Sequence, residues 1–263
     1  MSSKEKTVKA VHKKALDIIK TSRCADLSDA LDSMGLQDQY SMDPYMRPMI
    51  NLTSFCGIAR TLEFVKTDIK MPYMEYEEFE RLQYARKKDG GYKYFDNNLD
   101  PDVQDEAEKV MNANKGEVIV CAAHGLIGGI FGSDNGLGLL NRGVVGIILD
   151  GYMRDTPESI LQGLPVFSKG ISYVHPQGRI QIHAADKPVV CAGVLVMSGD
   201  VIFADHDGIV VIPARFADEV AYRSYKIQQI DRVNRRRKYE DAGKPMDETV
   251  ELLPDLARWF NHK

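Results

Sequence analysis

The chain has 263 residues, of which 44% are hydrophobic and 27% are charged, a balance typical of a globular protein with a sizeable core. Its formal net charge of −4 gives no electrostatic reason to expect nucleic acid as a partner. No apolar run approaches the roughly 18–20 residues of a membrane span, and the first residues lack the apolar core of a signal peptide, so we expect a cytoplasmic protein with no membrane partner.

The first third of the chain predicts helices followed by a strand. Apolar residues at near-helical spacing predict an amphipathic helix over residues 4–20. A second, short helix carries Leu27 and Leu31 on one stripe and stops at Gly35. Residues 36–53 are rich in turn formers, and residues 55–65 predict a strand.

The segment from about residue 66 to residue 115 differs in composition from the rest. It mixes charged residues with aromatic ones, among them Tyr73, Tyr76, Tyr84, Tyr92, Tyr94 and Phe95. We predict an inserted helical excursion with helices at roughly 73–88 and 101–113. Tyrosines among charges suit a plain surface excursion, and they equally suit a lid or a subunit contact.

A βαβ pattern begins at Gly116 and continues into a series of short strands. Its expected parts are a strand at 118–123, a glycine-rich turn at 124–132, a helix at 135–142, a strand at 144–149, a helix at 157–162 and a strand around Val166. Short apolar runs then alternate with turns to Pro213, and Asp207-Gly208 predicts a hairpin. Helices at 214–239 and 250–260 form a C-terminal helical extension, approximately 214–263.

The four cysteines and the basic residues carry no sign of a metal or nucleic-acid site. Cys24, Cys56, Cys121 and Cys191 are widely spaced without a C-x-x-C pair, so we expect buried free thiols. The basic cluster at residues 232–238 lies among acidic residues and predicts a solvated helix face.

A first candidate site is the glycine-rich loop from His124 to Asn135. Glycines before a helix allow backbone N–H groups to approach an anion, which the helix N-terminus also favours. The loop matches neither a G-x-G-x-x-G fingerprint nor a P-loop, so a tight turn without a ligand is the alternative.

A second candidate is the pair Arg154-Asp155. The apolar run 144–149 predicts a strand buried on both faces, and ligands collect beyond the carboxyl ends of such strands. Asp155 supplies a hard oxygen ligand for a divalent cation, and Arg154 supplies a guanidinium for a carboxylate or an enolate. The alternatives are a surface ion pair, or Asp155 as the N-cap of the helix that starts near Pro157.

A third candidate is the run Asp205-His206-Asp207-Gly208. Three potential metal ligands stand in a row, but alternate residues of a strand face opposite ways. A hairpin turn explains Asp207-Gly208 fully, so we expect a turn there and not a metal site. Among the histidines, His124 is of interest because it opens the glycine-rich loop.

The run from Gly125 to Asp155 resembles the RraA-like family, which includes the class II 4-hydroxy-4-methyl-2-oxoglutarate aldolases. The similar segments are Phe131-Gly132-Ser133-Asp134, Asn141-Arg142-Gly143-Val144-Val145-Gly146 and Asp150-Gly151-Tyr152-Met153-Arg154-Asp155. Weaker similarity extends in order over most of residues 20–215. The resemblance implies a single domain over residues 1–263 with an α/β fold, an α-β-β-α sandwich of the swivelling-domain type. It also implies homotrimers or homohexamers with sites at subunit boundaries.

The resemblance further implies a role for each residue of the motif. Asp155 would ligate a divalent cation, Mg²⁺ or alternatively Mn²⁺, and Arg154 would contact the carboxylate or enolate oxygen of the substrate. Gly132, Ser133, Asp134 and Asn135 would bind the substrate, with their backbone amides on its carboxylate. The aldolases commonly carry Asp or Glu where this chain has Ser133, an acid that helps to organise metal-bound water. We therefore expect a metal-bound water to move the proton, oriented by Asp134 or by an acid from a neighbouring subunit.

The leading hypothesis is a metal-dependent carbon–carbon lyase that acts on a pyruvate-type oxo acid. Retro-aldol cleavage of a 4-hydroxy-4-methyl-2-oxoglutarate-like substrate, or decarboxylation of oxaloacetate, would leave a pyruvate enolate stabilised by the cation and Arg154. One alternative is a non-catalytic regulator that binds a ribonuclease; the resemblance associates such members with loss of the acid that Asp155 represents. The other is a different reaction on a sugar-derived acid.

Overall fold

The computed structural model describes residues 11–50, 54–84 and 100–254, apart from the side chains of 82–84. The helices are α1 (Lys13–Ile19), α2 (Cys24–Asp32), α3 (Tyr76–Tyr84), α5 (Pro101–Met111), α6 (Ser133–Arg142), α7 (Thr156–Leu161) and α8 (Ala217–Asp241), with 3₁₀ turns η2 (Ala214–Phe216) and η3 (Glu248–Val250). The strands are β1 (Arg47–Pro48), β2 (Phe55–Lys66), β3 (Glu117–Ala122), β4 (Gly129–Phe131), β5 (Gly146–Met153), β6 (Val166–Ile171), β7 (Ile180–Ala185), β8 (Val189–Cys191), β9 (Val194–Val196), β10 (Val201–Asp205) and β11 (Gly208–Ile212).

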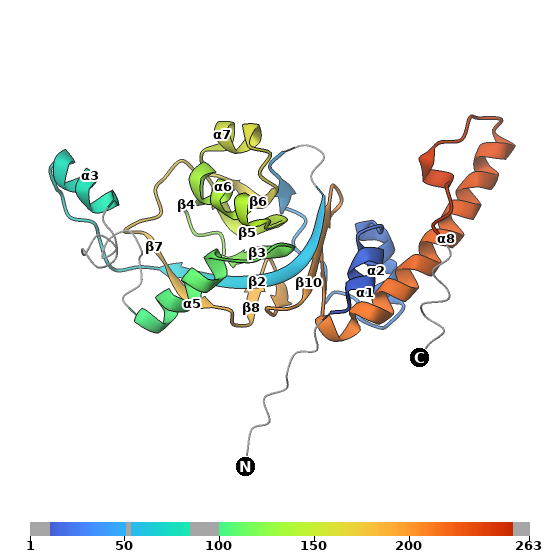
Figure 1. The fold of residues 1–263 in the computed structure, drawn as a ribbon, viewed down its shortest axis with the longest axis horizontal. Coiled ribbons are helices and arrows are strands. Elements are labelled where there is room, and N and C mark those ends of the chain that lie inside the picture. Colours follow the sequence, from blue (N-terminus) through green and yellow to red (C-terminus); the bar gives the residue numbers. More distant parts are fainter. Residues whose placement is uncertain (1–10, 51–53, 85–99, 255–263) are drawn as a thin grey trace, which may run out of the picture.

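The long strand β2 organises the main sheet, whose order is β1-β6-β5-β3-β2-β10-β11. Its first residues pair antiparallel with β10, its middle pairs parallel with β3, and its last residues pair antiparallel with β7. Figure 1 shows β2 bending across the molecule between these partners. Because the bent strand β2 pairs with different strands along its length, the sheet curls towards closure and acquires an inner and an outer surface.

Alternate residues of the central strands fill the two surfaces of this sheet. Val120 and Ile148 face the inner core, which the β8–β9 ribbon completes. Ile119, Ile147 and Leu149 face outwards, where α5 and α6 cover them. The central strands are therefore buried on both faces, as their apolar runs predict.

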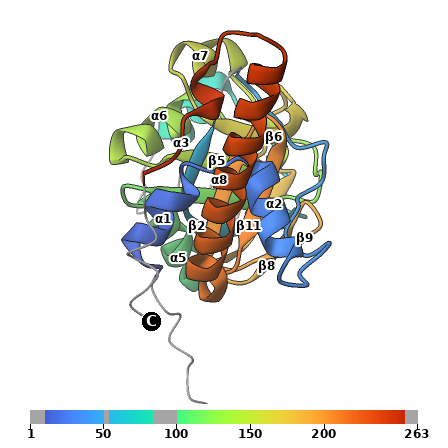
Figure 2. The same cartoon turned by 90° about the vertical axis from the view of Figure 1, so that its right-hand side faces the viewer.

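A second helical layer covers β10, β11 and the start of β2. Leu27, Leu31 and Val220 from α2 and α8 share one core with Phe203 and Ile212 of the sheet. Figure 2 shows α8 running over the sheet between α1 and α2. With α5 and α6 on the other half of the curled sheet, the layers follow the order helix, sheet, sheet, helix, and the predicted α/β class is confirmed.

Two predicted boundaries around the candidate site are wrong. Strand β5 continues past Leu149 to Met153, because the buried carboxylate of Asp150 finds partners inside the fold. Its oxygens lie 2.7 Å from Lys169 Nζ and 3.0 Å from Ala192 N. In addition, part of the predicted turn 124–132 is strand β4, which pairs with the end of β5.

The segment that precedes β3 contains two different kinds of helix. Ala107 and Val110 of α5 are buried in the same core as β3 and β5, so α5 belongs to the body of the molecule. Helix α3 lies at the far end of the molecule (Figure 1). Its first residue, Tyr76, is exposed, as is Tyr73 before the helix. Tyr92, Tyr94 and Phe95 lie outside the described residues.

The two termini depart partly from prediction. Residues 1–10 lie outside the described residues, so only α1 represents the helix expected over 4–20. Of the helix expected over 250–260, Val250 ends the 3₁₀ turn η3, residues 251–254 have no regular structure, and the remainder lies outside the described residues. All four cysteines are buried free thiols, as predicted. No helix of the described residues is long and apolar enough to cross a membrane.

Candidate functional site

Arg154 and Asp155 follow β5 directly and lie beside the start of α6. The short strand β4 pairs in parallel with the end of β5, and Arg154 N donates a hydrogen bond of 2.8 Å to Phe131 O. Since α6 begins at Ser133, this pairing places the helix start against Arg154 and Asp155. The βαβ arrangement thus brings together the two candidate segments that the sequence singles out.

The Asp155 carboxylate is directed towards the first residue of α6. Its Oδ2 accepts a 3.3 Å hydrogen bond from Ser133 N, and its Oδ1 accepts a 3.1 Å hydrogen bond from Arg154 Nε. Asp155 holds the N-cap position of α7, with a left-handed φ of 55°, but its side chain makes no capping bond there. The capping alternative is therefore wrong for the carboxylate, whereas the ion pair with Arg154 is present.

Two glycines make room for this pair. A Cβ on Gly132 would overlap Asp155 Oδ2, and a Cβ on Gly129 would lie 2.6 Å from Arg154 Cβ. The backbone of Gly132 is extended, so space, and not a positive φ, is what requires glycine there. The glycine-rich loop thus accommodates Arg154 and Asp155 at close range.

The donor chemistry at Asp155 suits a hard divalent cation. The side chain is 34% exposed, and a carboxylate that accepts two hydrogen bonds retains further lone pairs. Mg²⁺ keeps several water ligands and needs only one or two protein carboxylates. Within residues 11–50, 54–84 and 100–254, no group of three or more His, Cys, Asp or Glu side chains could hold a metal ion. Asp155 could therefore contribute one carboxylate ligand to such a cation.

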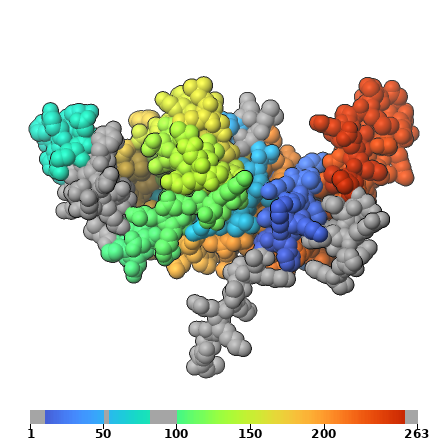
Figure 3. Space-filling view, viewed as in Figure 1, coloured from blue at the N-terminus to red at the C-terminus, as the bar shows by residue number. Residues whose placement is uncertain are grey.

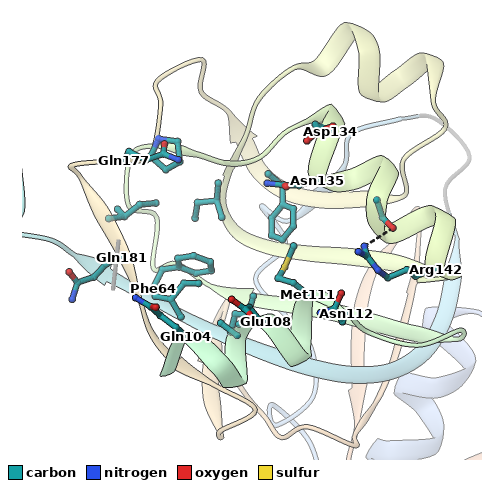
Figure 4. A pocket seen from close by; sticks show the side chains of 18 residues that line it. Phe64, Gln104, Glu108, Met111, Asn112, Asp134, Asn135, Arg142, Gln177 and Gln181 are labelled. Carbon is teal, nitrogen blue, oxygen red and sulfur yellow. Dashed lines mark hydrogen bonds between the residues drawn. The ribbon is translucent and has the colours of Figure 1, made fainter. Parts of the chain in front are cut away.

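The residues of the first turn of α6 contribute to two neighbouring features, the contact with Asp155 and a cavity. Ser133 contributes its N–H to Asp155, whereas Asp134 and Asn135 line a cavity of about 730 Å³ between α6 and α5. Figure 4 shows Asp134 and Asn135 at the start of α6 and Arg142 at its other end, with Gln177 and Gln181 across the cavity. Asp134 therefore belongs to the cavity wall, one residue after the N–H that contacts Asp155.

His175 is a neighbour of the site that sequence spacing does not reveal. Burial lowers its pKa below the usual value, and the positive charges of Arg154 and Arg179 lower it further, while Asp155 opposes them. The loop that carries His175 is attached to β4, since Gly129 N donates a 2.7 Å hydrogen bond to Val174 O. No local sequence motif indicates that His175 lies near the site, because its position depends on the pairing of β4.

The remaining candidate residues have structural partners. The hairpin predicted at Asp207-Gly208 is present between β10 and β11, but its turn residues are His206 and Asp207, and Gly208 begins β11. Asp205 Oδ2 accepts a hydrogen bond from Cys24 N at the start of α2. His124 Nε2 lies 3.3 Å from Glu63 Oε1 on β2. Asp205 and His124 thus each have a protein partner in the described part of the chain.

Comparison with known proteins places this chain in a family. The sequence profile of the RraA-like family (Aldolase/RraA) matches residues 24–211. A *Halalkalibacterium halodurans* protein provisionally named 4-hydroxy-4-methyl-2-oxoglutarate aldolase is 31% identical over 125 residues, 47% of this chain and 59% of the relative. A *Deinococcus radiodurans* protein with the same provisional name is 34% identical over 110 residues, 41% of this chain and 62% of that relative. The matches thus span about six-tenths of these relatives.

Two solved structures share the fold. The *Streptomyces coelicolor* RraAS2 structure, described as an unusual member of the RNase ES inhibitor RraA family, has a TM-score of 0.67 at 22% identity, covering 86% of this chain and 98% of that chain. An uncharacterised *Pseudomonas syringae* protein has a TM-score of 0.66 at 23% identity, covering 92% of this chain and 100% of its own. With the profile match over most of its length, the chain belongs to the RraA-like family.

Proposed function

We propose that the protein is a divalent-metal-dependent carbon–carbon lyase that cleaves a pyruvate-type 2-oxo acid. The observation that carries this proposal is the paired placement of the Asp155 carboxylate and the Arg154 guanidinium at the start of α6. Relatives provisionally named as aldolases support the reaction class. The presence of Asp155 favours an enzyme over a regulator that binds a ribonuclease, the alternative suggested by the solved structure described as an unusual member of an RNase ES inhibitor family.

Arg154 and Asp155 would have different roles towards a bound oxo acid. Arg154 would place its planar guanidinium against the carboxylate or the developing enolate oxygen, a preorganised charge of the kind that contributes most to such reactions. The N–H groups of the first turn of a helix have no intrahelical partner, so α6 can contribute to binding the carboxylate. A divalent cation held by Asp155, with Mg²⁺ the best match, would polarise the oxo group.

Proton transfer needs a further group near the enolate carbon. Ser133 lacks a carboxylate, so we assign the proton-transfer role to Asp134, in the first turn of α6. His175 is the second candidate for this role. Its lowered pKa keeps His175 neutral at pH 7, the form that accepts a proton.

We further propose that the active form is a homotrimer or homohexamer. Large apolar side chains stand exposed on segments that follow the pair in the chain, including Leu161 at the end of α7 and Tyr173 beyond β6, which are 88% and 91% exposed. Ile160 of α7 and Ile171 of β6 are exposed as well. Contact with a second copy would cover these side chains and place the site at a subunit boundary.

The test measures pyruvate release from 4-hydroxy-4-methyl-2-oxoglutarate and from oxaloacetate, together with Mg²⁺-dependent exchange of the methyl protons of pyruvate. Asp155→Asn should abolish the dependence on Mg²⁺, and Arg154→Lys should lower kcat about 10²-fold while a Mg²⁺-induced shift in Tm remains. Asp241→Asn, an exposed change at the end of α8, is the matched control.

Equal activity of wild type and both site variants would disprove the assigned roles. Absence of turnover, of proton exchange and of a Mg²⁺-dependent Tm shift in the wild type would remove the lyase proposal altogether. Inhibition of a purified ribonuclease by the same protein would then favour the regulator.

A further inference from the structure

The cavity between α5 and α6 adjoins the Arg154–Asp155 pair. Phe131 and Asp134 line it: Phe131 O accepts the hydrogen bond from Arg154 N, and Asp134 directly follows Ser133, whose N–H donates to Asp155. We propose, on the basis of the lyase function above, that this cavity binds the distal part of the substrate, and that this part is an uncharged, hydroxyl-bearing chain. The substrate class is then a sugar-derived 2-oxo acid and not a dicarboxylate.

One wall of the cavity is a polar face of α5. Gln104, Glu108 and Asn112 recur every four residues and so lie on one side of the helix, facing the cavity. Val110 of the same helix is buried in the core with β3 and β5, and Ala107 belongs to that core while it also lines the cavity, so the polar face is held in place. The wall is therefore preformed, as is usual for small-molecule sites.

The lining combines carboxamides with an apolar floor. Five lining side chains are carboxamides, namely Gln104, Asn112, Asn135, Gln177 and Gln181. A carboxamide offers both donors and an acceptor, and a hydroxyl group needs the same two functions. Carbon atoms of a sugar chain can rest on Phe64, Ile130 and Ile180. A volume of about 730 Å³ is within the usual range for a small-molecule site.

The charges of the lining disfavour a second carboxylate. Glu108 and Asp134 are acidic, and Arg142 is the one basic side chain among the described residues that line the cavity. Arg142 lies at the C-terminal end of α6, where its Nη1 already donates a 2.9 Å hydrogen bond to Gly138 O. A dicarboxylate would bring its distal charge among like charges, whereas hydroxyl groups meet acceptors and donors alike.

The test compares two oxo acids that yield pyruvate. In 2-keto-3-deoxygluconate the C3–C4 bond would break, and the C4 hydroxyl would lose its proton to become the aldehyde of glyceraldehyde. The electron pair would remain on C3 as the pyruvate enolate, which then takes up a proton. We expect kcat/KM for this acid to exceed that for 4-hydroxy-4-methyl-2-oxoglutarate by about tenfold or more.

Two variants test the lining directly. Gln104→Leu with Asn112→Leu keeps the side-chain size but removes the polar groups, and should lower the preference for the hydroxylated acid about tenfold. Glu108→Arg should shift the preference towards the dicarboxylate. Asp105→Arg is the matched control, because Asp105 is exposed on the same helix and does not line the cavity.

The outcomes separate this inference from the function on which it rests. If pyruvate proton exchange persists but the wild type shows no preference, or Glu108→Arg changes the preference no more than Asp105→Arg, the inference is overturned and the lyase function stands. If proton exchange is absent as well, the lyase function itself fails. Tm values of each variant confirm that the fold is retained.

Discussion

Close packing around Arg154 and Asp155 shows how single residues shape the candidate site. Asp155 has a left-handed backbone and a carboxylate that turns away from its own helix to meet Ser133 N. That direction is possible because Gly132 has no side chain. The glycine-rich loop therefore acts by admitting a neighbour's side chain, in addition to any role in exposing N–H groups.

Gly132→Ala tests this packing. The added methyl group would displace the Asp155 carboxylate, so we expect loss of Mg²⁺-dependent activity, together with a destabilisation of about 1–3 kcal/mol from overpacking. Activity assays and urea unfolding measure the two effects. Gly170→Ala is the control, since its methyl group would meet only the Tyr152 ring at ordinary contact distance. Full activity of Gly132→Ala would show that Asp155 does not need its present position.

At the scale of elements, the basic cluster of helix α8 contacts the segment of chain that follows the helix. Arg232 and Arg235 donate hydrogen bonds to backbone carbonyls of Glu251 and Thr249, both of 2.6 Å. Figure 3 shows the end of α8 and the returning chain as one mass at the end of the molecule opposite α3. The prediction of a solvated helix face is thus incomplete, because arginines of this face hold the returning segment by its carbonyls.

Arg235→Ala should loosen this segment. Loss of one charged hydrogen bond at a partly exposed position predicts a destabilisation of roughly 1 kcal/mol and faster amide exchange in residues 248–254. Hydrogen–deuterium exchange with mass spectrometry measures it. Arg237→Ala, at an exposed position of the same helix, should leave exchange unchanged. Equal exchange in both variants would mean that the carbonyl contacts do not restrain the segment.

At the scale of the whole molecule, the curled sheet brings charged residues of distant strands together. Arg60 of β2 pairs with Asp186, which follows β7, and Ser198 Oγ donates a 2.7 Å hydrogen bond to the same carboxylate. Burial raises the pKa of Asp186, but the hydrogen bonds from Arg60 and Ser198, with the nearby positive charges, lower it more, so its net pKa is below the usual value.

This pair predicts part of the acid sensitivity of the fold. Because the folded-state pKa of Asp186 is depressed, its contribution to stability is full above pH 3.8 and is lost as the pH falls through the lower folded value. Asp186→Asn should cost about 2 kcal/mol at pH 7 and flatten the loss of stability below pH 4. Urea unfolding at several pH values measures both. Asp38→Asn, a change at an exposed position, should leave the dependence of the unfolding free energy on pH unchanged. If Asp186→Asn also leaves that dependence unchanged, the role given to Asp186 is contradicted.

Local patterns in the sequence determine much of this protein. The apolar run 144–149 and the glycines before α6 predict a buried strand and a helix in the right order, because both depend on periodicity over a few residues. The motif that ends in Arg154-Asp155 indicates the family, which the profile match confirms. The exact end of β5 was not predictable, since Asp150 is acceptable in a strand only with Lys169 beside it.

Only the tertiary structure decides what surrounds the pair. The direction of the Asp155 carboxylate, the approach of His175 and the cavity that Asp134 shares with α5 all join segments far apart in the sequence. They depend on which strands pair and in what register, above all β4 with β5 and β2 with β7. Alternating hydrophobicity reports which faces are buried but not which strand lies next to which, so the chain alone indicates the reactive residues and the fold supplies their neighbours.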